Sequence, residues 1–323
     1  MSSLNVWRFR IPFRSPLTLK GRTYLEREGL LLDRDGQWAE ASPLPGFSPE
    51  TIDDVIAEIG NLKDQDLTSP GASVASPALR FALGWISQEF SAPISVPFNC
   101  LLVGDQDRIL SRAKEVASAG CTAAKLKVGR DKLEADVALV REVRAIIPPG
   151  VELRLDANQA WSFEEALKFS QETKDLDIGY IEEPLSDASR LEELFSHTGL
   201  KYALDESLIE GFSTGELDSL IDSCPNAAAI ICKPTIVGGR SSVQRLAQSG
   251  KPIVFSAAFE SGIGLARIVQ LAHEFSPDIP AGLDTLGWLT TDLLKSSPTK
   301  QKGRFEFSQP PMADTTDLER IEL

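Results

Sequence analysis

The sequence predicts an α/β protein: a modified TIM barrel of the (β/α)7β type with an N-terminal α+β capping domain. From residue 96 to residue 302, apolar strand-like segments alternate with amphipathic helical segments. Five successive strands end in a charged residue, at spacings of 29, 26, 23 and 28 residues: Lys127, Asp156, Glu182, Asp205 and Lys233. A closed parallel barrel places the carboxyl ends of its strands on one rim, so these five side chains are expected to meet there.

Residues 1–95 lack this alternation and are expected to form the capping domain, completed by the tail 303–323. Alternating apolar residues predict strands, and apolar residues at the helical period predict helices. Strands are expected at 5–13, 28–33 and 38–41, and helices at 50–62 and 77–90.

Residues 96–302 are expected to form the barrel domain. Its strands are expected at 97–103, 123–128, 152–156, 178–183, 202–205, 227–233, 252–256 and 279–283. Its helices include 107–119, 132–146, 162–173, 187–198 and 241–248. The alternative is an open doubly wound sheet, which brings together only residues near one switch point, and no G-x-G-x-x-G motif follows an early strand. The barrel is favoured because it gathers five successive strand ends.

The composition restricts the class of partner. The net charge is −14, from 33 basic and 47 acidic residues, so neither nucleic acid nor an anionic membrane is expected to bind. A small anionic carboxylate substrate remains open, since it responds to the field of its own pocket. No segment approaches the roughly 20 apolar residues that span a bilayer, and no apolar leader is recognisable, which favours a cytoplasmic protein. The cysteines show no C-x-x-C spacing and are expected to be reduced thiols: Cys100, Cys121, Cys224 and Cys232.

Three acidic residues end consecutive strands and are candidate metal ligands: Asp156, Glu182 and Asp205. A single acid at the end of a strand is more often a turn or helix-capping residue, but three at matched positions indicate a shared site. An all-oxygen site with few protein ligands favours Mg²⁺, with Mn²⁺ as a substitute. The neighbours Glu183 and Glu206 face the other way on their strands and are expected to support the ligands or to cap helices.

Three lysines accompany these acids. Lys125 and Lys127 share one face of their strand. Lys233 ends the strand that comes four strands later, so it is expected roughly opposite them across the barrel. Two ammonium groups crowded near a dication lower the proton affinity of at least one of them, so a lysine can act as a base near neutral pH. The two histidines, His197 and His273, lie at positions that favour surface or packing roles, and no G-x-S-x-G motif is present.

Two glycine-bearing segments follow the sixth and seventh strands, 234–239 and 256–264. They either form plain turns or present backbone N–H groups to an anionic substrate, and both interpretations stay open. In the second case Ser256, Ser261 and Gly262 are candidate substrate-binding residues.

Together these residues resemble the enolase superfamily, and within its muconate-lactonising subgroup they are similar to the o-succinylbenzoate synthase family. The segments that carry the likeness are 42–48, 125–127, 153–161, 205–208, 233–235 and 282–286. The resemblance implies Mg²⁺-dependent syn-dehydration of 2-succinyl-6-hydroxy-2,4-cyclohexadiene-1-carboxylate to o-succinylbenzoate in menaquinone biosynthesis. Lys127 would remove the α-proton, the metal would stabilise the enediolate, Lys127 would protonate the departing hydroxide, and Lys233 would stabilise the anion. The capping domain, with the candidate loops 17–24 and 44–47, would close over the succinyl arm.

The resemblance also implies supporting roles for residues beside the catalytic lysine and the metal ligands: Lys125, Arg154, Asn158 and Glu206. The main alternative is an N-acylamino acid racemase or dipeptide epimerase, in which Lys127 and Lys233 would each exchange a proton. Dipeptide epimerases of the subgroup hold the substrate amine with a D-x-D pair, and segment 282–284 offers only Asp284. A barrel that binds a metal or ligand without catalysis is the remaining alternative, and the five retained charged positions argue against it.

Overall fold

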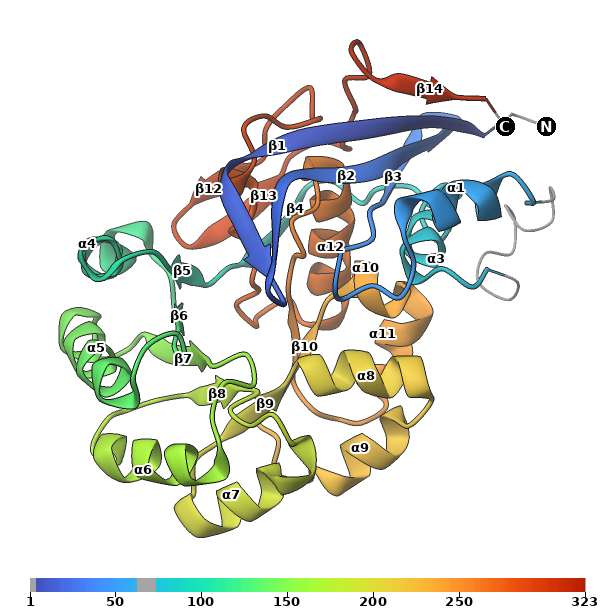
Figure 1. The fold of residues 1–323 in the computed structure, drawn as a ribbon. Coiled ribbons are helices and arrows are strands. Elements are labelled where there is room, and N and C mark those ends of the chain that lie inside the picture. Colours follow the sequence, from blue (N-terminus) through green and yellow to red (C-terminus); the bar gives the residue numbers. More distant parts are fainter. Residues whose placement is uncertain (1–3, 63–73, 323) are drawn as a thin grey trace.

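A computed structural model describes residues 4–62 and 74–322 (Figure 1). The N-terminal part forms an antiparallel sheet in the order β14-β1-β2-β3. Its strands are β1 (Asn5–Leu19), β2 (Arg22–Arg34), β3 (Gln37–Ala41) and β14 (Glu319–Ile321). Pairing of β14 with β1 brings the C-terminal tail to this sheet. Helices α1 (Ile52–Ile59) and α3 (Pro77–Leu83) follow, and α3 ends at Gly84, earlier than the pattern predicted.

The expectation of a loop at 17–24 was wrong. This segment forms the paired ends of β1 and β2, with Leu17 opposite Tyr24 and a turn at Lys20 and Gly21, both at positive φ. The strands pair beyond the expected limits because their register resumes after an irregularity between Pro12 and Leu17. The resulting hairpin arm reaches from the N-terminal sheet toward the barrel strands (Figure 1).

The second sheet is parallel and has the order β11-β10-β9-β8-β7-β6-β5. Its strands are β5 (Cys100–Leu102), β6 (Ala123–Lys127), β7 (Glu152–Asp156), β8 (Tyr180–Glu182), β9 (Tyr202–Leu204), β10 (Ala229–Cys232) and β11 (Ile253–Phe255). The expected eighth strand is reduced to two parallel bridges, Phe98 with Ala281 and Ser256 with Gly282. These bridges join the two edges of the curled sheet, so the predicted (β/α)7β class is confirmed.

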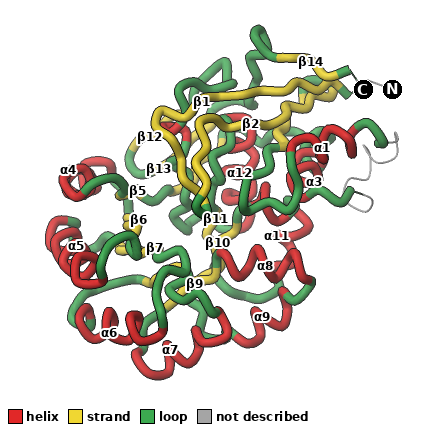
Figure 2. Tube along the Cα trace, in the orientation of Figure 1, coloured by secondary structure: helices red, strands yellow, loops and turns green. Residues whose placement is uncertain are grey.

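Helices surround the parallel strands on the outside (Figure 2). They are α4 (Gln106–Ala119), α5 (Leu133–Ile146), α6 (Phe163–Thr173), η1 (Ala188–Arg190), α7 (Leu191–Thr198), α8 (Glu206–Thr214), α9 (Leu217–Ser223), α10 (Pro234–Val237), α11 (Arg240–Ala247), α12 (Gly262–Phe275) and η2 (Leu286–Trp288). The sequence pattern did not reveal α12, because its residues from Gly262 to Ala272 are all buried and leave no polar face.

A small sheet, β12-β13-β4, packs at the amino-terminal side of the barrel domain. Its strands are β4 (Ile94–Pro97), β12 (Thr299–Gln301) and β13 (Arg304–Phe307). Within the described part of the chain, no helix is long and apolar enough to cross a membrane.

The expectation of four reduced cysteines was wrong for one pair. Cys100 and Cys121 form a disulfide, because β5 and β6 are neighbours and Cys121 lies just before β6. Spacing along the chain does not reveal such a contact between adjacent strands. Cys224 and Cys232 are buried free thiols.

Candidate active site

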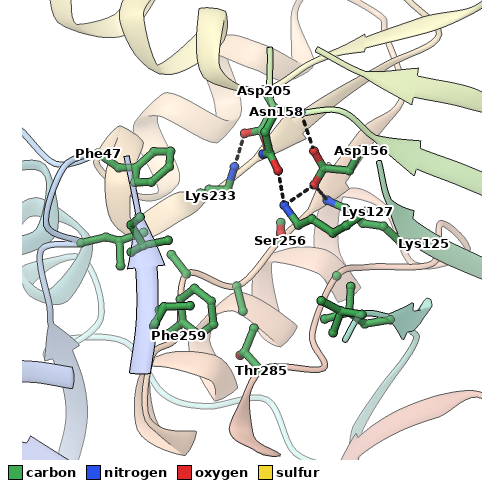
Figure 3. Close-up of a pocket in the computed structure, with 18 of the residues that line it drawn as sticks. Phe47, Lys125, Lys127, Asp156, Asn158, Asp205, Lys233, Ser256, Phe259 and Thr285 are labelled. Carbon is green, nitrogen blue, oxygen red and sulfur yellow. Dashed lines mark hydrogen bonds and ion pairs between the residues drawn. The ribbon is translucent and has the colours of Figure 1, made fainter. Parts of the chain in front are cut away.

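A cavity of about 440 Å³ lies at the carboxyl ends of the barrel strands. The β1–β2 hairpin contributes Leu17 to Lys20, and the loop after β3 contributes Leu44 and Phe47, so both segments that the resemblance placed over the substrate line the cavity. Figure 3 shows the charged side chains gathered at one end of the cavity and Phe47 and Phe259 at another side. The cavity therefore combines a charged end with an apolar wall.

The three candidate metal ligands lie at the carboxyl ends of three neighbouring strands. Asp156 ends β7, Glu182 ends β8, and Asp205 directly follows β9. Their side chains are almost completely buried, with 1 to 2% of each residue exposed: Asp156, Glu182 and Asp205. The parallel register aligns Lys127 with Asp156 and Asp156 with Glu182. Adjacent strands lie about 4.8 Å apart, so this alignment brings the acids together.

Lys125 lies between two of these acids. Its Nζ is 2.8 Å from Asp156 Oδ2 and 2.5 Å from Glu182 Oε2. Burial disfavours the ammonium, but the surrounding carboxylates outweigh burial and raise the pKa of Lys125 well above its ordinary value. Lys125 is therefore a cation in this arrangement, so Lys127 is left as the lysine of this pair that could act as a base.

Lys127 belongs to a short chain of polar contacts. Its Nζ lies 2.8 Å from Asp156 Oδ2 and donates to Asn158 Oδ1 at 2.5 Å. Asn158, held at positive φ, donates through Nδ2 to Glu206 Oε1 at 2.9 Å. The structure thus places Asn158 and Glu206 beside Lys127, and both line the cavity.

Lys233 ends β10 on the far side of the acids from Lys127, and it donates to Asp205 (Figure 3). Its burial disfavours the ammonium, and Asp205 and Glu206 outweigh that effect and raise the pKa of Lys233. Glu183 Oε1 accepts hydrogen bonds from the N–H groups of Asp205 and Ser207. It therefore caps the start of α8, one of the two roles expected for it.

Among the described residues, Arg154 forms no hydrogen bond or ion pair with Lys127 or with the candidate metal ligands. It pairs with Glu152 at 2.7 Å, donates to the carbonyl of Pro280 at 2.6 Å, and lies over the ring of Tyr180. Strand alternation explains the difference, because Arg154 points into the barrel two residues before Asp156 and so lies one layer deeper. The expected contact was wrong.

The substrate-binding role considered for Ser261 and Gly262 is also corrected by the structure. The N–H of Ser261 donates to Glu40, and the N–H of Gly262 donates to Asp292 Oδ1 at 2.7 Å. Carboxylates of this chain thus accept from the N–H groups that the second of the two open interpretations assigned to a substrate, and neither residue lines the cavity. Ser256 does line it.

The first glycine segment, 234–239, serves packing. A Cβ atom at Gly238 would lie 2.9 Å from Arg80 Nε, and one at Gly239 would lie 2.9 Å from the Cα of Phe81. Both glycines are at positive φ and let α3 approach the barrel closely. Of the two interpretations left open for segment 234–239, the structure therefore supports a turn and packing role and not the binding of an anionic substrate.

Two cavity residues lay outside the segments that the sequence analysis named: Arg130 and Trp288. Arg130 lies in the loop after β6 and Trp288 ends the short helix η2, so no long periodic pattern marks either of them. Asp284 also lines the cavity, and its carboxylate is engaged by Arg112 at 2.9 Å and Lys300 at 2.6 Å. Its two partners leave it little capacity to bind a substrate amine.

The acidic side chains at this end of the cavity meet the needs of a divalent cation only in part. Across residues 4–62 and 74–322, no three acidic, histidine or cysteine side chains are arranged around one point, because the lysine Nζ atoms lie among the carboxylates. The charge balance nevertheless fits a cation. Burial, partly offset by Lys125, raises the pKa of Glu182 to about 7, while burial and Asp205 raise the pKa of Glu206. Burial disfavours the Asp156 carboxylate, but Lys125 and Lys127 outweigh burial and lower the pKa of Asp156, so the lysines compensate this acid but not Glu182 and Glu206. A further cation beside these two acids would offset their burial, and hard oxygen donors suit Mg²⁺.

Comparisons with known proteins agree with this geometry. Residues 108–311 match the family described as enolase C-terminal domain-like, and residues 1–90 match the N-terminal domain of MenC. The o-succinylbenzoate synthase of Haemophilus influenzae is 32% identical, covering 92% of this chain and 94% of that protein. An o-succinylbenzoate synthase of Escherichia coli is 30% identical, covering 99% of this chain and 100% of that protein.

Solved structures show the same fold. The L-Ala-D/L-Glu epimerase from Bacillus subtilis has a TM-score of 0.76 at 20% identity and covers 97% of both chains. The o-succinylbenzoate synthase from Thermosynechococcus elongatus, with magnesium in its active site, has a TM-score of 0.71 at 24% identity. It covers 86% of this chain and 92% of that one.

Proposed function

The chain belongs to the o-succinylbenzoate synthase family of the enolase superfamily and is a carbon–oxygen lyase, and from this premise we propose its reaction. The proposed reaction is syn-dehydration of 2-succinyl-6-hydroxy-2,4-cyclohexadiene-1-carboxylate to o-succinylbenzoate, in menaquinone biosynthesis. One observation carries this proposal: five charged side chains gather in one buried cluster. They are Lys127, Asp156, Glu182, Asp205 and Lys233.

Lys127 is the proposed base. As a neutral amine it takes the proton α to the ring carboxylate, which leaves an enediolate on the substrate. As the resulting ammonium it gives a proton to the departing hydroxyl group, so water leaves and the ring becomes aromatic. Removal and return on one face give the syn outcome. The Asn158 contact at 2.5 Å holds the Lys127 amine in place for both transfers.

Lys233 has a different role in this proposal. It stays an ammonium because Asp205 and Glu206 raise its pKa, so it stabilises negative charge on the substrate and moves no proton. Lys125 likewise stays charged and orders Asp156 and Glu182. Only Lys127 then exchanges a proton with the substrate.

Asp156, Glu182 and Asp205 are the residues proposed to hold a divalent cation, Mg²⁺ or Mn²⁺. The cation would supply positive charge beside the substrate carboxylate when the enediolate forms. Exclusion of water strengthens every charge interaction in this site. In this proposal residues 1–95 and the tail form the cap of the barrel 96–302, and Leu17, Leu44 and Phe47 cover the succinyl arm.

Ultraviolet detection of the aromatic product tests this function. Wild type should produce o-succinylbenzoate with Mg²⁺ and should lose this activity in EDTA. Lys127→Ala should abolish it, while Lys114→Ala, at an exposed lysine of α4, should not. Product formation by Lys127→Ala at the wild-type rate would refute the assignment of the base. Absence of product with wild type and Mg²⁺ would refute the dehydration and favour a barrel that only binds its ligand.

The racemase or epimerase alternative is favoured by its shared fold, as in the Bacillus subtilis epimerase. Asp284 argues against an amine-containing substrate, because Arg112 and Lys300 already engage its carboxylate. Incubation with N-acylamino acids or dipeptides in D₂O separates the two functions. Incorporation of α-deuterium at a rate comparable with dehydration would support the alternative, and its absence would support dehydration alone.

A further inference from the structure

Arg27 of β2 is a buried cation that the proposed reaction does not use. Only 2% of the residue is exposed. Its guanidinium contacts no carboxylate directly and donates to four backbone carbonyls: those of Phe259 at 3.2 Å, Glu28 at 3.0 Å, Pro43 at 2.6 Å, and Ser42. A buried guanidinium is costly to desolvate, so a full set of acceptors at this place indicates a specific structural task.

Three of these carbonyls lie in or next to segments that line the cavity, and the fourth is that of Glu28 on β2 itself. Ser42 and Pro43 lead directly into Leu44, on the cap side, while Phe259 follows β11 on the barrel side. Phe259 is held at φ +63°, an unusual conformation for a bulky residue, and its ring packs against Trp288 with centroids 5.8 Å apart. One side chain thus joins the cap wall to the barrel wall.

A second connection lies beside the first. Glu40 of β3 is fully buried and accepts hydrogen bonds from Ser261 Oγ at 2.5 Å and from the N–H of Gly264 at 3.1 Å, at the start of α12. Its other oxygen accepts from Ser42 Oγ at 2.6 Å. A Cβ atom at Gly264 would lie 3.0 Å from the Glu40 carboxyl carbon, so glycine provides the space for this contact.

The network continues to the catalytic strand. Glu260, which is fully buried, accepts from Thr235 Oγ1 at 2.5 Å and from the N–H of Ala258 at 2.6 Å. Thr235 lies two residues after Lys233, and Ala258 lines the cavity. Burial lowers the pKa of Arg27, and the nearby buried carboxylates of Glu260 and Glu40 partly offset that effect, so the three groups interact across this interface.

We propose that Arg27 is a positioning residue for the dehydration: it fixes the cap loop 42–47 against the barrel segment 257–260 and so sets the shape of the substrate cavity. This inference rests on the proposed function. Lysine cannot replace arginine here, because a single ammonium lacks the planar fork that reaches carbonyls on two separate segments. The positioning role therefore depends on the guanidinium and not on charge alone.

Kinetics of Arg27→Lys and Arg27→Met test the proposal, with Arg22→Met, at an exposed arginine of the same strand, as the control. Loss of the cap contact should raise KM for the cyclohexadiene substrate about tenfold or more while kcat falls less than about threefold. A purely structural role would lower the fraction of folded enzyme, and hence kcat, at unchanged KM. That result, or wild-type kinetics in Arg27→Lys, would overturn the proposal.

Hydrogen exchange gives a readout that does not depend on the reaction. In Arg27→Lys, peptides covering 42–48 and 257–261 should exchange faster than in wild type and in Arg22→Met, while β7 should be unchanged. Unchanged exchange in these two segments would refute the connection. If wild type fails to dehydrate the substrate but the exchange result holds, the proposed function fails and the connection between cap and barrel stands. If Arg27→Met does not fold, Arg27→Lys decides both measurements.

Discussion

Lys127 Nζ lies 2.8 Å from Asp156 Oδ2, and these two residues are direct partners in the register of β6 and β7. Backbone hydrogen bonds between two strands, and not flexible loops, therefore place the backbones of the proposed base and the first proposed metal ligand side by side. The contacts of Lys127 with Asp156 and Asn158 then hold its amine beside the proposed metal site, as proton transfer there requires.

Lys127→Arg separates base chemistry from charge. Arginine keeps the positive charge but cannot give up its proton near neutral pH, so dehydration should fall by about 10³-fold or more. Initial rates of aromatic product formation at saturating Mg²⁺ measure this. A variant that keeps a tenth or more of the wild-type rate would show that the charge of Lys127 suffices.

Glu182→Gln tests the metal site without reference to turnover. Removal of one carboxylate charge should weaken Mg²⁺ binding by about tenfold or more, as measured by titration calorimetry. Glu172→Gln, at a residue of α6 remote from the cavity, is the matched control and should bind like wild type. Equal affinity in Glu182→Gln would exclude Glu182 as a ligand.

Asp284→Asn tests whether this acid contacts the substrate. Because Asp284 pairs with Arg112 and Lys300, the change should leave kcat and KM for dehydration within about threefold and should lower stability by about 1 kcal/mol. Steady-state kinetics and thermal unfolding measure the two effects. An increase of KM by about tenfold or more, at unchanged stability, would instead make Asp284 a substrate contact.

Glu183 predicts a pH dependence of stability. Burial, only partly offset by its hydrogen bonds to Ser207 and Asp205, raises the pKa of Glu183 from 4.5 to about 7 in the folded protein. Between these values the folded state binds more protons than the unfolded state. Its contribution to stability is therefore present below the unfolded pKa and is lost as pH rises through about 7.

Glu183→Gln should remove this contribution, because an amide does not titrate. Its oxygen can still accept from the three donors to Glu183 Oε1, which are the N–H groups of Asp205 and Ser207 and the Ser207 hydroxyl. Its NH₂ takes the place of Glu183 Oε2, which has no partner. The unfolding free energy of wild type relative to the variant should fall by about 2 kcal/mol from pH 5 to pH 8. Denaturant titration in EDTA at several pH values measures it. Parallel curves for the two proteins would contradict the raised pKa.

Much of the fold and of the charged cluster follows from the sequence. The β6 to β11 strands are short apolar segments between amphipathic helices, and a parallel sheet converts that order directly into neighbouring strands. Strand order then places Lys127, Asp156, Glu182, Asp205 and Lys233 on one rim. Their identity and grouping could be predicted because they depend only on chain order and on the period of the strands.

Only the tertiary structure decided which groups face the cavity and which are already paired. The sequence could not show that Ser261 and Gly262 give their N–H groups to Glu40 and Asp292, since those acids lie far away in the chain. Nor could it show that Arg27 joins the two walls. Such contacts depend on how separate units pack against each other, and packing between units leaves no periodic pattern in the sequence of either one.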